Sequence, residues 1–215
     1  MADRETVIAT ICKAFERTEY PGDAFLLGST EGCEPLEEVG PFRGRQDWQA
    51  IEPDFLDAHA GALSFLSEGG FRYFLPAYLV ADLREQLKTA DPLFHLTHGF
   101  SDIAVQAPTK SRAFLIKSGK SAFVNPRRYG ALTFQDSARF RLSVFPREEA
   151  VAIVAYLTCK RAHDPDGLDR EPIDAALTAF WLERARAAPP AEALRRHIQD
   201  QEDYLTAIRK QGGVR

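Results

Sequence analysis

The sequence predicts an α+β fold that is predominantly α-helical, with a small antiparallel β insertion at about residues 110–134. Over most of the chain, apolar side chains recur every three or four residues, which is the period of an amphipathic helix. Prolines, glycines and capping residues separate these stretches. Between residues 90 and 142 the helical period disappears, and two runs of β-prone residues flank a glycine-containing turn at 117–120.

Length and composition favour one domain. The chain has 215 residues, of which 45% are hydrophobic and 27% charged, and such a chain can bury a large core. We therefore expect a single domain over 1–215, with a helical core built from 1–90 and 143–215. A basic, strand-rich insertion at 91–142 separates the two helical parts.

The first helix is expected over 3–17, where Ile8, Ile11 and Phe15 fall on one face. The stretch at 22–46 is rich in glycine, proline and acidic residues, so we expect an irregular arm there.

The aromatic centre of the chain predicts more helix. One helix is expected to begin at Asp47, which can cap it, or at Pro53, which suits a first helical position. A short turn should cover 67–74. Because a proline inside a helix removes a hydrogen bond, we expect a break or kink at Pro76, followed by a helix over 77–88.

In the insertion, 112–116 and 121–124 read as a hairpin, and 130–134 supplies a third strand. Helical structure returns at Pro146, with a buried face of Val151, Val154 and Leu157. Two more helices are expected, beginning at Glu171 and at Ala191.

Helical spacing and aromatic density also predict the core. The side chains expected to be mostly buried and in mutual contact are Trp48, Phe55, Phe65, Phe74, Leu75, Leu79, Val154, Leu157, Phe180 and Trp181.

Three dispersed cysteines, Cys12, Cys33 and Cys159, predict neither a disulfide framework nor a zinc knuckle, and reduced thiols fit a cytoplasmic protein. The charged N-terminus does not resemble a signal peptide, and no apolar run is long enough to span a membrane.

The residues from Phe42 to Leu79 form an FxG…W…LSFLS…FRYFLPAYL block. This block resembles an uncharacterised bacterial protein family of unknown function, whose members are small and mostly helical. In that family an amphipathic helix follows the block, and 146–157 would be that helix here. The resemblance implies a helical fold and a bacterial cytoplasm, and it implies no catalytic residue.

Few motifs in the sequence carry chemistry. His95 and His98, with Asp102 four residues on, have a spacing that suits one metal ion, but a metal site needs three or four ligands. Asp164 and the acids after it resemble a calcium loop, although Asp-Pro-Asp-Gly is also a common turn. We therefore expect no metal and no cofactor.

The charges are divided along the chain. Residues 110–147 carry nine basic side chains and one acidic one, whereas 19–57 carry ten acidic and two basic ones, in a chain of net charge −4. The basic block either binds an acidic partner or docks on the acidic arm of its own chain. If it binds a partner, the contact residues are expected to be Lys120, Arg127, Arg128 and Tyr129.

These observations favour a non-enzymatic interaction protein, of an immunity or accessory type, that contacts an acidic protein partner through its basic hairpin region. The alternative is a hydrolase or transferase with a cleft that contains His95, His98 and arginines. A nucleic-acid-binding module ranks third, because a pI near 5.8 does not suit a dedicated nucleic-acid binder. The sequence sets no oligomeric state.

Overall fold

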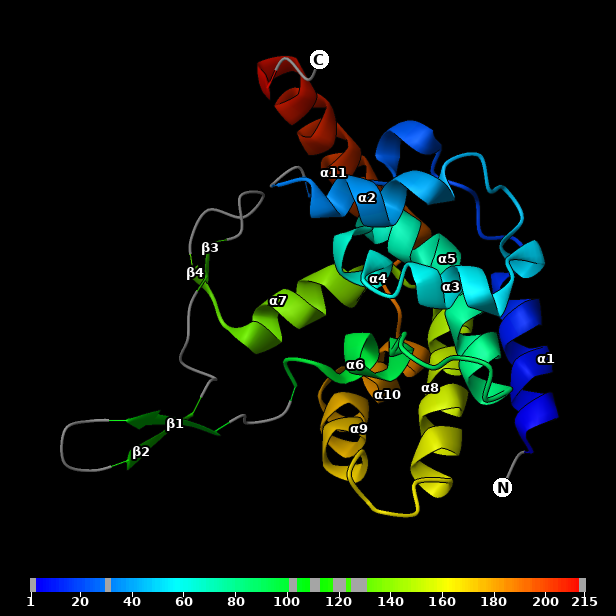
Figure 1. The fold of residues 1–215 in the computed structure, drawn as a ribbon, viewed down its shortest axis with the longest axis vertical. Coiled ribbons are helices and arrows are strands. Elements are labelled where there is room, and N and C mark those ends of the chain that lie inside the picture. Colours follow the sequence, from blue (N-terminus) through cyan, green and yellow to red (C-terminus); the bar gives the residue numbers. More distant parts are fainter. Residues whose placement is uncertain are drawn as a thin grey trace.

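Figure 1 shows a computed structural model of the chain, which describes residues 3–29, 32–100, 104–108, 113–117, 123–124 and 131–212. The described part is predominantly helical, as the sequence predicts. The helices before residue 100 are α1 (Arg4–Phe15), η1 (Asp23–Phe25), α2 (Glu34–Val39), η2 (Gly40–Phe42), η3 (Trp48–Ala50), α3 (Pro53–Ala58), α4 (Ala62–Phe65), α5 (Glu68–Leu83) and α6 (Pro92–Thr97).

The later helices return to the same body, where α8 packs against α1 and α10 packs against α8. They are α7 (Phe134–Arg141), η5 (Leu142–Val144), α8 (Arg147–Ala162), α9 (Arg170–Ala176), the π-helical turn η6 (Leu177–Trp181), α10 (Leu182–Arg186) and α11 (Ala191–Gly212).

Two short strand pairs lie beside this body in Figure 1. β1 (Ala104–Pro108) pairs antiparallel with β2 (Ala113–Lys117), and β3 (Phe123–Val124) pairs antiparallel with β4 (Ala131–Leu132). The expected hairpin between 112–116 and 121–124 is therefore wrong, since β2 pairs with the strand before it.

The region 91–142 also contains helix that periodicity did not predict. Asp91 caps α6, accepting a hydrogen bond from the Phe94 amide at 3.0 Å, and Thr133 caps α7. These caps, rather than a long apolar stripe, define two helices of only six and eight residues. In the expected irregular arm, α2 likewise forms a short helix.

The break expected at Pro76 is wrong, because α5 runs through this proline without interruption. A proline in a helix interior costs about 3 kcal/mol. Burial of Phe71, Phe74 and Tyr78, each fully enclosed, contributes about 1.5–3 kcal/mol per side chain. The Ser67 hydroxyl accepts a hydrogen bond from the Gly70 amide at 2.9 Å and starts the helix. Packing and capping together outweigh the cost of the proline.

One hydrophobic cluster contains residues from both ends of the chain. The ring of Phe145 lies 6.3 Å from Phe15 in α1, 6.0 Å from Phe71 in α5 and 5.6 Å from Trp181 in η6. These edge-to-face contacts connect elements far apart in the sequence.

Most of the expected core residues are buried, but Phe55, Phe65 and Val154 are only partly buried against the cluster. The buried face of α8 differs from the expected one: Val151 is 45% exposed, whereas Glu149 is only 2% exposed.

Candidate functional site

The four expected contact residues, Lys120, Arg127, Arg128 and Tyr129, lie outside the described residues. Asp102 also lies outside them. The contact surface at these four residues therefore stays a prediction.

Three other arginines of the basic block are described, and each donates to a backbone carbonyl of the helical body. Arg139 donates to the Ala179 oxygen at 2.6 Å, Arg147 to the Ala185 oxygen at 3.3 Å, and Arg141 to the Leu63 oxygen. Carbonyls near helix ends lack partners within the helix, and arginine side chains can supply them. These three cations therefore have internal roles.

The acidic arm also uses carboxylates internally. Asp57 accepts hydrogen bonds from the amides of Lys88, Thr89 and Ala90 at 2.8–3.1 Å. Burial acts to raise the pKa of Asp57, but the three amides outweigh it and hold the pKa below its ordinary value. Across the described parts of both segments, no ion pair joins the acidic arm to the basic block.

The histidines singled out by the sequence lie together at one hollow of about 260 Å³ between α4, α6 and α7. α7 contributes Phe134, Ser137, Ala138 and Arg141, which follow the i, i+3, i+4, i+7 spacing of one helical face. The other lining residues are Ser64, Phe94, His95, His98 and Leu142. Sequence reasoning counted Arg141 only as part of the charge block, and this helical spacing was the signal that it missed.

Close packing fixes the position of α6 against its neighbours. The Trp181 indole nitrogen donates to the Leu96 carbonyl at 2.9 Å. Gly99, just after the helix, has a φ of 91°, and a Cβ there would lie 2.9 Å from the Phe134 carbonyl oxygen. Only glycine permits this close approach of the α6 end to α7. The backbone therefore places the His98 ring beside α7.

Arg141 is held between a ring and a carbonyl. Its guanidinium lies 4.7 Å from the centroid of Phe71, in a cation–π arrangement, and donates to the Leu63 oxygen. Burial lowers the pKa of Arg141, and Glu68 acts in the opposite direction. An arginine nevertheless stays protonated in proteins, so this hollow holds a fixed positive charge.

Both histidines are neutral at pH 7. Burial, and then the charge of Arg141, lower the pKa of His95 to about 3. The same two causes lower the pKa of His98. The His98 ring stacks on Phe94 with ring centroids 4.6 Å apart. A neutral imidazole offers one donor and one acceptor, and both rings therefore act as hydrogen-bonding groups rather than as cations.

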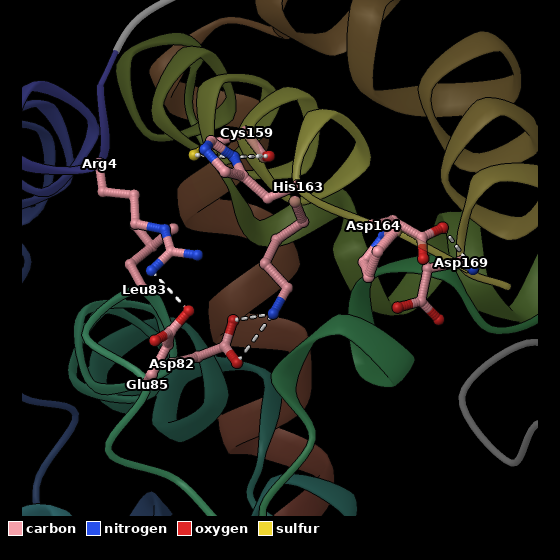
Figure 2. A pocket seen from close by; sticks show the side chains of 10 residues that line it. Arg4, Asp82, Leu83, Glu85, Cys159, His163, Asp164 and Asp169 are labelled. Atoms are coloured by element: carbon pink, nitrogen blue, oxygen red, sulfur yellow. Dashed lines mark hydrogen bonds and ion pairs between the residues drawn. The ribbon is translucent and has the colours of Figure 1, made fainter. Parts of the chain in front are cut away.

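Figure 2 shows a second hollow, of about 230 Å³, near the ends of α5 and α8. Its cations are already paired, with Lys160 Nζ 3.0 Å from Asp82 and an Arg4 nitrogen 2.6 Å from Glu85. The Tyr156 hydroxyl also donates to Asp82, at 2.6 Å. This arrangement anchors α8 to the end of α5.

Cys159 and His163 also line this hollow, but they do not form a nucleophile and base (Figure 2). His163 Nδ1 lies 2.8 Å from the Cys159 carbonyl oxygen, so this nitrogen carries the proton and donates it there. The same nitrogen faces the thiol at 3.7 Å and cannot accept its proton. Burial raises the pKa of the Cys159 thiol, which further disfavours the thiolate.

The calcium-like sequence at 164–169 forms the turn that its composition also suggested. Asp164 accepts hydrogen bonds from the amides of Gly167 and Asp169, each at 3.0 Å. Throughout the described part of the chain, no three His, Cys, Asp or Glu side chains gather in a way that would hold a metal ion.

A model of a family of unknown function, DUF6714, matches residues 3–185. The chain belongs to this family. This membership agrees with the resemblance to an uncharacterised family that the aromatic block suggested. No curated protein and no solved structure matches the chain. Among the helices of the described residues, none combines the length and the apolar character that crossing a bilayer requires.

Proposed function

We propose that this DUF6714 protein is a non-enzymatic interaction protein that contacts an acidic protein partner through its basic insertion. An immunity or accessory role in a bacterial cytoplasm suits such a protein. In this proposal the small antiparallel insertion presents Lys120, Arg127, Arg128 and Tyr129 to the partner.

One observation carries the proposal: among the described residues, three arginines of the basic block and Asp57 of the acidic arm bind backbone groups, and no ion pair joins the two segments. Arg139, Arg141 and Arg147 donate to carbonyls, and Asp57 accepts from amides. This pattern argues against the alternative in which the block only neutralises the arm.

The remaining basic residues are concentrated. Between residues 110 and 128 the chain has six lysines and arginines and no acidic residue, although its net charge is −4. A local positive field of this kind raises the association rate with an acidic surface and makes binding salt-dependent. Asn125-Pro126 stiffens the chain just before Arg127 and Arg128.

The experiment compares R127Q/R128Q with R195Q/R196Q, using polyglutamate as the acidic probe. Arg195 and Arg196 form another adjacent pair, both exposed, on α11, so the control removes the same charge elsewhere. We expect R127Q/R128Q to weaken binding about tenfold or more and to flatten its salt dependence, while the melting temperature stays within about 2 °C. The control should bind like the wild type.

Equal losses in the two variants would show a general charge effect and would contradict the proposal. A marked fall in the melting temperature of R127Q/R128Q alone would instead favour docking on the acidic arm. Tighter binding to duplex DNA than to polyglutamate at matched salt would favour the nucleic-acid alternative.

A hydrolase or transferase is the second candidate, because His95, His98 and Arg141 line one hollow. None of the described residues that line the hollow is acidic or carries a thiol, and histidines with lowered pKa values are weak general bases. Hydrolysis of p-nitrophenyl acetate or p-nitrophenyl phosphate that H98Q abolishes would favour this candidate.

A further inference from the structure

We propose that the hollow between α4, α6 and α7 binds a small oxyanion, a phosphate or carboxylate group, with Arg141 as its charged donor. This site uses none of the residues of the basic contact surface, and it stands independently of the proposed function.

The first argument is charge. Among the described residues that line the hollow, Arg141 is the one ionised side chain, and none is acidic. A guanidinium has five N–H groups, and the described part of the chain supplies a single hydrogen-bond acceptor to this one, the Leu63 carbonyl. The remaining donors match the forked geometry of a carboxylate or phosphate.

The second argument is the set of neutral donors around the charge. Ser64 and Ser137 line the hollow with hydroxyl groups, and His95 and His98 line it with neutral imidazoles. Each of these side chains can donate one hydrogen bond to an oxygen held by Arg141. Because they are neutral, they add donors without adding charge.

The third argument is the wall of the hollow. Phe94, which is 47% exposed, and Phe134 flank the polar groups. The His98 ring lies 4.6 Å from Phe94 and 6.2 Å from Phe134. Apolar walls lower the local dielectric constant, which strengthens an ion pair between Arg141 and an anion.

The size of the hollow limits the ligand. At about 260 Å³ it lies just below the range of about 300–1,000 Å³ that is typical of drug-sized ligands. A compact anion, or the anionic end of a larger molecule, fits this space.

The hollow of Figure 2 provides an internal contrast. There Lys160 pairs with Asp82, Arg4 pairs with Glu85, and further carboxylates line the wall. An anion would be repelled at that site. The two hollows have similar volumes, so charge rather than size distinguishes them.

The experiment follows the histidine ring resonances of the full chain by NMR during titration with inorganic phosphate, and separately with acetate. Sodium chloride keeps the ionic strength constant, and H95Q and H98Q assign the two rings. We expect a saturable shift of the His98 ring with at least one of the two anions. A stronger response to phosphate assigns a phosphate ligand, and a stronger response to acetate assigns a carboxylate.

R141K keeps the charge but loses the forked donors, and it should weaken binding about tenfold or more. R147K is the matched control, since Arg147 belongs to the same block but donates to the Ala185 carbonyl outside the hollow. It should bind like the wild type. S137A, a milder change, should weaken binding about threefold to tenfold even if R141K does not fold. Ring shifts that chloride reproduces, or equal binding by wild type and S137A, would overturn the proposal.

Discussion

The ion pair between Arg72 in α5 and Glu149 in α8 gives the sharpest test of how this fold is stabilised. Arg72 Nε and a terminal nitrogen each lie 2.7 Å from a different Glu149 oxygen, and Thr18, which follows α1, donates to the same carboxylate at 2.8 Å. The Glu149 side chain is 3% exposed and that of Arg72 is 20% exposed. One buried carboxylate thus joins three segments of the chain.

Two opposite contributions, the desolvation of Glu149 and its attraction to Arg72 and Thr18, determine how much a mutation here changes the free energy of unfolding. Burial raises the pKa of Glu149, whereas Arg72 and Thr18 lower it. Burial is the larger effect, and the pKa of Glu149 is raised on balance. Removing one partner leaves a buried charge uncompensated, and we expect E149A to cost about 3–5 kcal/mol in free energy of unfolding. Replacing both partners with apolar side chains of similar length removes both charges, so R72M/E149M should lie within about 1 kcal/mol of the wild type.

The assay is urea denaturation at pH 7, followed by circular dichroism, for the wild type, R72M, E149A and R72M/E149M. D174A is the matched control, because Asp174 forms a similarly short pair with Arg161 but both side chains are about half exposed. It should cost less than about 1 kcal/mol. The reasoning is refuted if E149A costs no more than D174A, or if the double variant is as unstable as the sum of the single ones.

Two further predictions concern the core and the hollow. F74A should cost about 3–5 kcal/mol in urea denaturation, because Phe74 is fully buried and its ring lies 4.8 Å from that of Phe42; a cost below about 1 kcal/mol would contradict this packing. The pKa of His95 is about 3 in the folded chain against about 6.5 in the unfolded chain, so the free energy of unfolding should fall as the pH falls below 6.5, by roughly 2.5 kcal/mol between pH 7 and 4.5. H95Q should remove that part of the acid sensitivity, and parallel pH–stability curves for H95Q and wild type would refute it.

The helices were predictable where a single face carries apolar residues. Ile8, Ile11 and Phe15 are buried on α1 as the period predicts. Pro76 misled the prediction, since a local rule treats it as a helix break and only the packing of the whole of α5 makes up for its cost. Sequence periodicity gives no information on that packing energy, because it comes from contacts with the rest of the fold.

The buried face of α8 also could not be predicted from periodicity alone. Periodicity favours valines over a glutamate as buried residues, yet Glu149 is buried and Val151 is exposed. A buried carboxylate requires partners, and here they come from Arg72, 77 residues earlier, and from Thr18. No local pattern shows that such distant partners converge.

The candidate site was predictable in part. The spacing of His95 and His98 singled out these two histidines, although Pro92 and Gly99 suggested a loop there. In the structure α6 carries His95 and ends just before His98. Arg141 stood out only as one charge among nine. Its inward direction depends on the packing of α7 against the Phe71 ring and the Leu63 carbonyl, and those contacts exist only in the folded chain.

The last helix adds to this fold beyond the residues that the family model covers. The match ends at residue 185, whereas α11 begins at Ala191. Gln201 in α11 is buried, and its side-chain oxygen Oε1 accepts a hydrogen bond from the backbone amide of Glu68, in the first turn of α5, at 2.9 Å. His197 lies 2.5 Å from the Glu68 carboxylate. Amides in the first turn of a helix have no partner within that helix, so α11 completes the capping of the central helix of the body. In this chain α11 therefore packs against the helical body and helps to fix the start of α5 through Glu68.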